Sequence, residues 1–265
     1  MFNFCSLYSG SSGNSSLIQS DNTNILVDAG ESAKKIVNAL SSINVSMESI
    51  DAIVVTHEHL DHVKSIGTLS KKYNIPVYAT EKTWLAMPNQ SAKIDKRYQR
   101  FFSSSTKFSI GDLDISPFSI PHDAADPCGF NISNSNRQLS IATDLGHITP
   151  ELLSNISNSS FILLESNYDP EILKFSKYPY YLKHRISGEY GHLSNIDAGK
   201  IISKLSSTNK NLKSVMLGHL SRENNFPELA YKTVIDELLD RKCDFSNLSI
   251  NVATRNSPSE LIKIS

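Results

Sequence analysis

The chain contains 265 residues, of which 39% are hydrophobic and 20% are charged, so it can bury a sizeable core. This composition excludes a disordered chain, a collagen-like chain and a small disulfide scaffold. Its 26 Lys and Arg nearly balance its 27 Asp and Glu, for a net charge of -1, which excludes a protein coated in basic charge but permits a local basic groove.

Two further features bear on location. No apolar run approaches the roughly 20 residues that a membrane-spanning helix needs, and a signal peptide is not indicated by the first residues, MFNFCSLYSGSSGNSS. The three cysteines, Cys5, Cys128 and Cys243, are odd in number and form no CxxC pair. We therefore expect reduced thiols, a cytoplasmic location and no membrane partner.

The first third of the chain alternates short apolar runs with helical spacing. Strands are expected at 2–8, 16–19, 24–27, 50–55 and 76–79. Helices are expected at 32–43 and 63–73, where apolar residues recur on one face. The run at 50–55 is continuously apolar apart from Asp51 and β-branched, which is typical of a buried central strand.

Strands dominate the middle of the chain, and alternation with helices then returns. Successive strands are expected at 100–105, 107–110, 113–120, 129–133 and 138–143, with turns at Gly111-Asp112 and Ser135-Asn136. Helices at 149–156, 194–205 and 227–239 then alternate with strands at 161–165, 213–217 and 248–252. Thr149 is the expected N-cap of the first of these helices, and Ser194 or Asn195 that of the second.

This order of elements predicts an α/β protein in which two sheets pack face to face between outer layers of helices. The sequence contains no Pro-rich linker and no sharp shift in composition. We therefore expect a single domain over residues 1–265.

The segment most informative about function is Thr56-His57-Glu58-His59-Leu60-Asp61-His62, which contains three of the eight histidines. It directly follows the predicted buried strand, where a rigid scaffold displays functional groups. His57 and His59 are two positions apart, so they project the same way from an extended loop and can bind one metal ion. Asp61 and His62 can reach a second position nearby.

The residue types in this segment indicate a catalytic metal site. Imidazole and carboxylate ligands suit Zn²⁺, and also Mn²⁺ or Fe. No cysteine lies nearby to close a structural zinc site. The pattern therefore predicts an open site whose metal keeps a water.

Ligands from elsewhere in the chain must complete such a site. Four candidates follow predicted strands or precede a helix: His122, Asp144, His192 and His219. Each residue alone is equally compatible with a capping or core role. In combination with the first motif, we interpret all four as part of the site.

THEHLDH resembles the HxHxDH signature of the metallo-β-lactamase superfamily of hydrolases. Other segments are similar to the YycJ/WalJ-like bacterial proteins, which are related to PhnP-type phosphodiesterases and more distantly to tRNase Z. These segments are SGSSGNSSL, HDAADPCGF, TDLGH, ESNYD, LKHRISGEYGHLSN and GHLSRENN. The resemblance covers nearly the whole chain and implies a four-layer αββα sandwich with two mixed sheets.

The resemblance also implies a ligand set for two divalent ions per chain, Zn or Mn with Fe as a further option. One ion is expected on His57, His59 and His122, and the other on Asp61, His62 and His219. Asp144 is expected to bridge them, and His192 to lie where related phosphodiesterases place a histidine that meets the substrate phosphate.

Two divalent ions about 3.5–4 Å apart can share a bridging hydroxide as the nucleophile. Asp61 is a candidate catalytic residue because it can orient this hydroxide. His192 is the other candidate, since a histidine can stabilise the charge on the phosphate or protonate the leaving oxygen.

Candidate substrate-binding residues are less distinctive. Lys183 and Arg185 can contact phosphates, with neighbouring tyrosines as stacking partners, although a solvated loop explains them equally well. Arg222, just after His219, is a further candidate for a phosphate contact. Asn14, in the Gly/Ser loop at 9–15, either lines the metal pocket or belongs to a plain hairpin turn.

Three functions compete. The first, which the resemblance favours, is a two-metal phosphodiesterase or exonuclease acting on DNA, with no obligate protein partner. The second is a hydrolase of a small cyclic phosphodiester, or of a thioester or lactone. The third is a non-catalytic, metal-stabilised scaffold, against which the complete ligand set argues.

Overall fold

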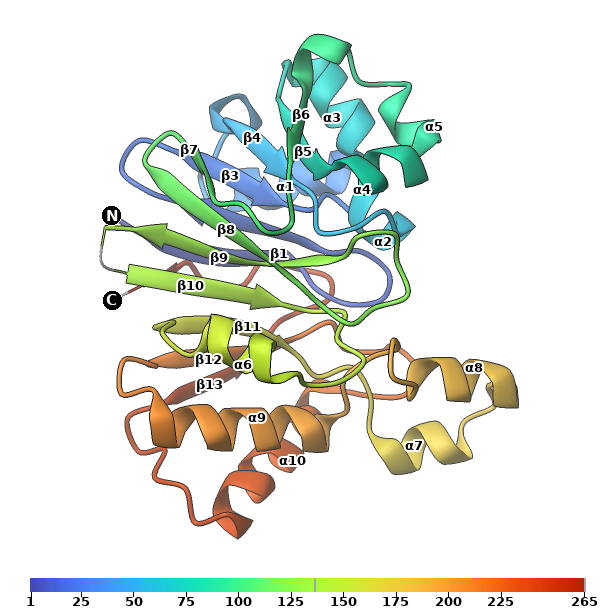
Figure 1. Cartoon of the computed structure of the whole chain (residues 1–265), viewed down its shortest axis with the longest axis vertical. Helices are drawn as coiled ribbons and strands as arrows, with labels where there is room; N and C mark the ends of the chain where they lie inside the picture. Colours follow the sequence, from blue (N-terminus) through green and yellow to red (C-terminus); the bar gives the residue numbers. More distant parts are fainter. Residues whose placement is uncertain (136, 265) are drawn as a thin grey trace.

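The computed structural model describes residues 1–135 and 137–264, so the second residue of the predicted Ser135-Asn136 turn lies outside the described residues. Two sheets of seven strands form the centre of the molecule (Figure 1). Their strand orders are β14-β1-β2-β3-β4-β5-β6 and β13-β12-β11-β10-β9-β8-β7.

The first sheet is mixed. It contains β1 (Asn3–Tyr8), β2 (Ser15–Gln19), β3 (Asn24–Val27), β4 (Ala52–Val54), β5 (Val77–Thr80), β6 (Gln99–Phe102) and β14 (Ile262–Lys263). β1, β2 and β3 pair antiparallel, as does β14 with β1, whereas β3, β4, β5 and β6 pair parallel. β3 and β4 therefore end at the same edge of the sheet.

The second sheet is mixed as well. It contains β7 (Phe108–Ile110), β8 (Leu113–Ser119), β9 (Cys128–Asn134), β10 (Arg137–Ala142), β11 (Phe161–Glu165), β12 (Ser214–Gly218) and β13 (Ser249–Val252). β10 to β13 pair parallel. β8 and β10 both run antiparallel to β9, so β8 ends at the same edge as β10, β11 and β12.

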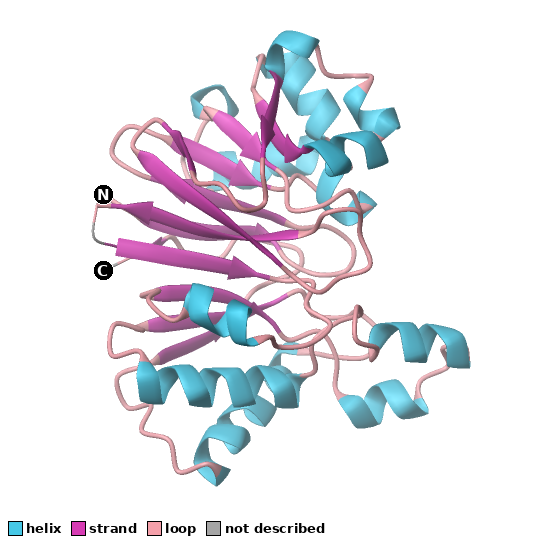
Figure 2. Ribbon diagram, in the orientation of Figure 1, coloured by secondary structure: helices cyan, strands magenta, loops and turns pink. Residues whose placement is uncertain are grey.

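Helices cover the outer faces of both sheets (Figure 2). The connections of the first sheet contain α1 (Ala33–Ser42), α2 (Leu60–Val63), α3 (Ile66–Tyr73), α4 (Glu81–Ala86), α5 (Pro88–Ser91) and the short turns η1 (Met47–Ser49) and η2 (Lys96–Tyr98). Those of the second contain α6 (Pro150–Ile156), α7 (Pro170–Phe175), α8 (Tyr180–Ile186), α9 (Asn195–Thr208) and α10 (Pro227–Asp240). In Figure 1, α7 and α8 lie apart from α6, α9 and α10.

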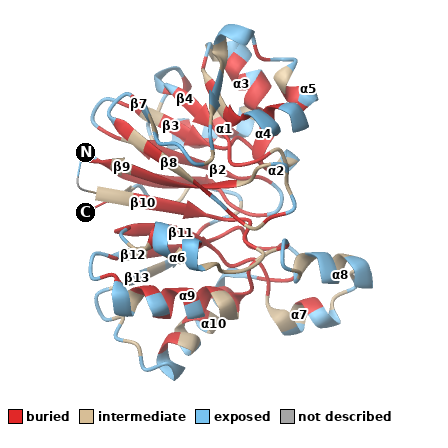
Figure 3. Cartoon of the chain, viewed as in Figure 1, coloured by how far each residue is buried: buried red, intermediate tan, exposed pale blue. Residues whose placement is uncertain are grey.

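The alternating directions of side chains along a strand explain why each sheet packs on both faces (Figure 3). In β11, Phe161 and Leu163 belong to the core between the sheets, whereas Ile162 and Leu164 pack with α9 and α10. Successive side chains of a strand point to opposite faces, so one apolar run can serve two cores. Across the inner core, the rings of Phe4 and Phe161 lie 4.6 Å apart. The predicted sandwich of two mixed sheets between helical layers is confirmed.

The helix predicted at 63–73 is wrong in its boundaries. The structure instead has two helices, α2 from Leu60 and α3 from Ile66. Ser65 separates them because its N–H and hydroxyl groups bond to the carbonyl oxygen of Ala29, and its hydroxyl also to that of Glu31. The earlier start places Asp61 and His62 on a helix rather than ahead of it.

Several short elements were not predicted from the sequence: α4, α5, α7, α8 and β14. α8 has no buried residue, so it lacks the apolar stripe from which a helix is recognised. β14 has only two residues, and its partner β1 lies at the opposite end of the sequence. In the described part of the chain, no helix is both long and apolar enough to cross a membrane.

The burial of the cysteines predicts their reactivity. Burial raises the pKa of Cys5, and it raises the pKa of Cys128 to about 12, so neither forms appreciable thiolate near neutral pH. Cys243 is partly exposed. With Ellman's reagent at pH 8, we expect the native protein to react at one thiol and the denatured protein at all three. Cys243→Ser should remove the native reaction, and rapid labelling of Cys128 would contradict this prediction.

Candidate metal centre

The predicted ligands converge at the edge where the parallel strands of both sheets end. His57 follows β4, Asp144 follows β10 and His219 follows β12. In each of four sets of side chains, the ligand atoms lie within 4.8 Å of one another. These sets are His57, His59 and His122; Asp61, His62 and His219; His57, His62 and Asp144; and Asp144, Glu165, His192 and His219.

Asp144 lies between the histidines of the two predicted ion sites. Its Oδ2 is 3.3 Å from Nε2 of His62, and its Oδ1 is 3.5 Å from Nε2 of His219 and 3.7 Å from Nε2 of His122. Oδ2 is buried and forms no hydrogen bond. A buried carboxylate oxygen without a partner is costly, and a divalent cation among these imidazoles would satisfy it. The residues present therefore fit a metal ion.

The electrostatics of the cluster are consistent with this fit. Burial would raise the pKa of Asp61, but His62 and His219 hold it well below its usual range. Burial lowers the pKa of His57 well below its usual value, so it is neutral and able to bind metal. Burial also acts to lower the pKa of His219, but Asp144, Asp61 and Glu165 raise it to about 10. Protons on histidines balance these carboxylates, and a bound cation would take over that role.

Glu165, the last residue of β11, positions two histidines at once. Its Oε1 is 2.8 Å from Nδ1 of His192 and 2.8 Å from Nδ1 of His219. Its Oε2 accepts the N–H groups of Leu145 and Leu193. Burial acts to raise the pKa of Glu165, but His192 and His219 hold it well below its usual range. Glu165 thus stays ionised and fixes the orientation of both rings.

Asp28 contacts a predicted ligand and was not expected at the site from the sequence. It follows β3, and its Oδ2 lies 2.8 Å from Nδ1 of His62. The same carboxylate accepts hydrogen bonds from the N–H and hydroxyl groups of Thr56 at 2.9 and 2.8 Å. A ligand histidine held through its second nitrogen is a common feature of metal sites. The available signal was an aspartate directly after a buried strand that neighbours the strand of the motif.

Asn14 belongs to the wall of the cluster. Its side-chain nitrogen lies 3.1 Å from Nε2 of His62 and 3.3 Å from Oδ2 of Asp61, and its N–H donates to the carbonyl oxygen of Asp61 at 2.8 Å. Gly30 makes this close approach possible, because a Cβ there would lie 1.6 Å from the same carbonyl oxygen. The Gly/Ser loop therefore lies against the THEHLDH motif, which agrees with the first of the two interpretations given above.

The sequence of this chain matches the profile of the β-lactamase superfamily domain over residues 23–218. The chain belongs to the β-lactamase superfamily. The exodeoxyribonuclease WalJ of Streptococcus pneumoniae serotype 2 (strain D39 / NCTC 7466) is 38% identical over 239 residues, covering 89% of this chain and 88% of that protein. The exodeoxyribonuclease YycJ of Bacillus anthracis is 36% identical over 239 residues, covering 90% and 89%.

Solved structures agree on the fold of this superfamily member. The metallo-β-lactamase fold protein YhfI from Bacillus subtilis superposes with a TM-score of 0.68 at 16% identity, covering 97% of this chain and 99% of that one. The short form of human tRNase Z superposes with a TM-score of 0.65 at 13% identity, covering 99% of each. At these identities the likeness shows the fold alone. The resemblance inferred from the motifs is confirmed.

Other predicted residues of the superfamily site lie around the cluster. His192 is 3.7 Å through Nδ1 from Oδ1 of Asp144, and its side chain is 19% exposed. Arg185, on α8, donates to Asp123 at 2.6 Å, next to His122 in the chain. Lys183 donates to the carbonyl oxygen of Lys174, and the side chain of Arg222 is 79% exposed. These three cations do not contact the ligand cluster, and their roles stay predictions.

The contact between Asp28 and His62 leads to a test. We expect Asp28→Asn to weaken metal binding by about 10–100-fold, because an amide cannot replace the charge that orients the ligand imidazole. A competition titration of the purified protein with a chelating dye measures this affinity. Asp236→Asn is the matched control, because Asp236 lies exposed on α10 and pairs with Lys232, away from the cluster. Equal affinity of Asp28→Asn and the unaltered protein would rule out this role.

Proposed function

We propose that this protein is a metal-dependent exonuclease that hydrolyses phosphodiester bonds in DNA, and that it works in the cytoplasm. The observation that carries the proposal is the convergence of the imidazole and carboxylate ligands around the unpartnered oxygen of Asp144. The names of the two relatives described above, both exodeoxyribonucleases, support the choice of DNA. Hydrolysis is the chemistry of this superfamily that such a ligand set suits.

The proposed site holds two ions. His57, His59 and His122 would hold one, Asp61, His62 and His219 the other, and Asp144 would contact both. Zn²⁺ and Mn²⁺ fit this donor set, and Fe is a further option. When bound, such a pair lowers the pKa of water to supply a nucleophile at neutral pH and neutralises charge on the phosphate.

Asp61 and His192 have distinct proposed roles. Asp61 is held ionised by His62 and His219, so its carboxylate is available to accept a hydrogen bond from the attacking water. Glu165 engages Nδ1 of His192, which leaves Nε2 of that ring for the substrate. A protonated His192 would donate from Nε2 to the oxygen that leaves the phosphorus atom. The adjacent Glu165 carboxylate stabilises the positive charge that this role requires.

Metal removal tests the proposal directly. We expect elemental analysis of the untreated protein to find about two divalent metal atoms per chain. Chelation should abolish release of nucleotides from end-labelled duplex DNA, and added Zn²⁺ or Mn²⁺ should restore it. Parallel assays on a cyclic phosphodiester, a thioester and a lactone examine the alternative substrates. An intact metal content with cleavage of only one of these small substrates would overturn the assignment to DNA.

Replacement of His192 separates catalysis from metal binding. We expect His192→Ala to lower kcat on DNA by about 10²–10⁴-fold while the metal content stays unchanged, because a proton donor is lost and no predicted ion ligand is removed. His147→Ala is the matched control, since His147 contacts the carbonyl oxygen of Glu189 instead of the cluster. Full activity of His192→Ala would exclude the proposed proton transfer.

A further inference from the structure

A charged cavity lies next to the predicted ligand His219. It has a volume of about 540 Å³, within the range of small-ligand sites, and its lining includes Ser9, Leu220, Arg222, Phe226 and Arg255. The hydroxyl of Ser9 accepts the N–H of His219 at 2.8 Å, and Leu220 is the next residue in the chain. The cavity is therefore next to His219, one of the predicted ligands.

The charge of this cavity is positive. Its lining contains two guanidinium groups, those of Arg222 and Arg255, and no acidic residue among the described residues that form it. The nearest carboxylate to Arg222 is that of Glu223, 3.9 Å from its Nε, and both side chains are more than half exposed. An ion pair between exposed side chains is weak in water, so Glu223 leaves most of the positive charge of the cavity uncompensated.

Among the residues that the structure describes, Arg255 has no ion-pair partner and is held by the backbone. Its Nη2 donates to the carbonyl oxygen of Leu220 at 3.0 Å. Gly10 packs against it: with φ at +151°, a Cβ at this position would lie 3.6 Å from Nε of Arg255 and 3.1 Å from the same carbonyl oxygen. Burial and the like charge of Arg222 both lower the pKa of Arg255. An anion between the two guanidinium groups would relieve this repulsion.

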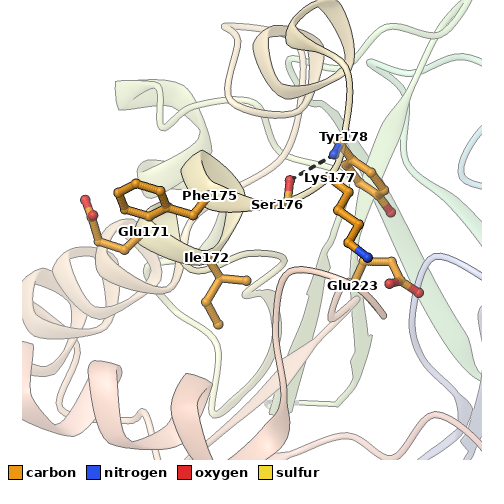
Figure 4. Close-up of a pocket in the computed structure, with 7 residues that line it drawn as sticks. All are labelled: Glu171, Ile172, Phe175, Ser176, Lys177, Tyr178 and Glu223. Carbon is orange, nitrogen blue, oxygen red and sulfur yellow. Dashed lines mark hydrogen bonds between the residues drawn. The ribbon is translucent and has the colours of Figure 1, made fainter.

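Other features of the lining suit a nucleotide. Phe226 is 48% exposed and offers a face on which a base can stack. α10 begins at the cavity with no side chain capping its first turn, but the carboxylate of Glu228 in that turn offsets the positive end of the helix dipole. By contrast, the cavity in Figure 4 is lined by Glu171 and Glu223 with Lys177 as its only cation. That cavity is net negative and does not suit a phosphate.

We propose that the cavity is a phosphate subsite, in which Arg222 and Arg255 bind a phosphate group of the DNA strand adjacent to the one at the metal centre. This inference rests on the proposed function. The shared chemistry is a phosphate oxygen on a guanidinium group, whether that phosphate is a terminal monoester or an internal diester. The subsite would hold the strand in register while its neighbouring bond is cut.

The test measures binding of a fluorescein-labelled single-stranded oligonucleotide as a function of KCl concentration. The metal-loaded His192→Ala protein is used so that the strand is not consumed. We expect Arg222→Gln and Arg255→Gln each to weaken binding about tenfold at low salt and to reduce the slope of log K against log [KCl] by about 0.7. Arg255→Lys should retain the slope, because it retains the charge.

Controls separate the subsite from general effects. Arg97→Gln removes a guanidinium group on η2 whose side chain is 72% exposed, close to the 79% of Arg222. This change should leave DNA binding unchanged. Arg222 is exposed, so its variant tests the inference even if Arg255→Gln unfolds the protein. A slope and an affinity of Arg222→Gln that match those of Arg97→Gln would overturn the subsite, as would the same result for a folded Arg255→Gln.

The inference and the proposed function can fail separately. If the protein does not hydrolyse DNA but Arg222→Gln still weakens phosphate-dependent binding, the function fails and the subsite stands. If DNA is hydrolysed and neither arginine affects binding, the subsite fails and the function stands. Oligonucleotides with a phosphate at the 5′ end, at the 3′ end or at neither end identify the source. An arginine effect confined to one terminal phosphate supports a monoester ligand, and an effect on all three supports an internal diester.

Discussion

The buried charge at the strand edge is the constraint on which the rest of the structure depends. Asp28, Asp144 and Glu165 are each almost completely buried, beside the buried rings of His57, His62 and His219. An ionised carboxylate taken out of water without partners costs several kcal/mol. The fold tolerates these groups because each carboxylate faces an imidazole or a backbone N–H. Oδ2 of Asp144 also faces an imidazole, that of His62 at 3.3 Å, but it forms no hydrogen bond, and a divalent cation can satisfy it.

Backbone conformation places these groups. Asp28, Asp144 and His219 all adopt left-handed conformations, with φ of 63°, 62° and 56°. Such a conformation costs of order 1–3 kcal/mol for a residue that is not glycine, and it persists only where the surroundings determine it. In each case the residue follows a buried strand, and the sharp turn redirects the chain at the edge of the sheet. The rigidity of two packed sheets thus holds side chains from distant parts of the sequence in one cluster.

The same architecture accounts for what surrounds the cluster. Gly30 allows the backbone at Asp61 to approach closely, and Gly10 allows the loop before β2 to reach Arg255. Gly10 and Asn14 belong to the same loop, at 9–15, so one short loop contacts both the predicted ion ligands and the arginine cavity. The proposed exonuclease would then bind one phosphate at the metal centre and a neighbouring one at the arginines, with Ser9 and His219 between the two sites.

Local patterns were sufficient to predict much of this protein. The continuous apolar runs identify the central strands, the density of histidines in THEHLDH predicts a metal site, and position after a predicted strand predicts Asp144 and His219 as ligands. Such signals lie within a few consecutive residues, where periodicity and side-chain chemistry act directly. The contact of Asp28 with His62, the double contact of Glu165 and the shared cavity of Arg222 and Arg255 have no such signal. The residues in these contacts lie 27 to 54 positions apart in the sequence, 33 in the case of the arginines, and only the packing of the sheets and the turns at their edges brings them together.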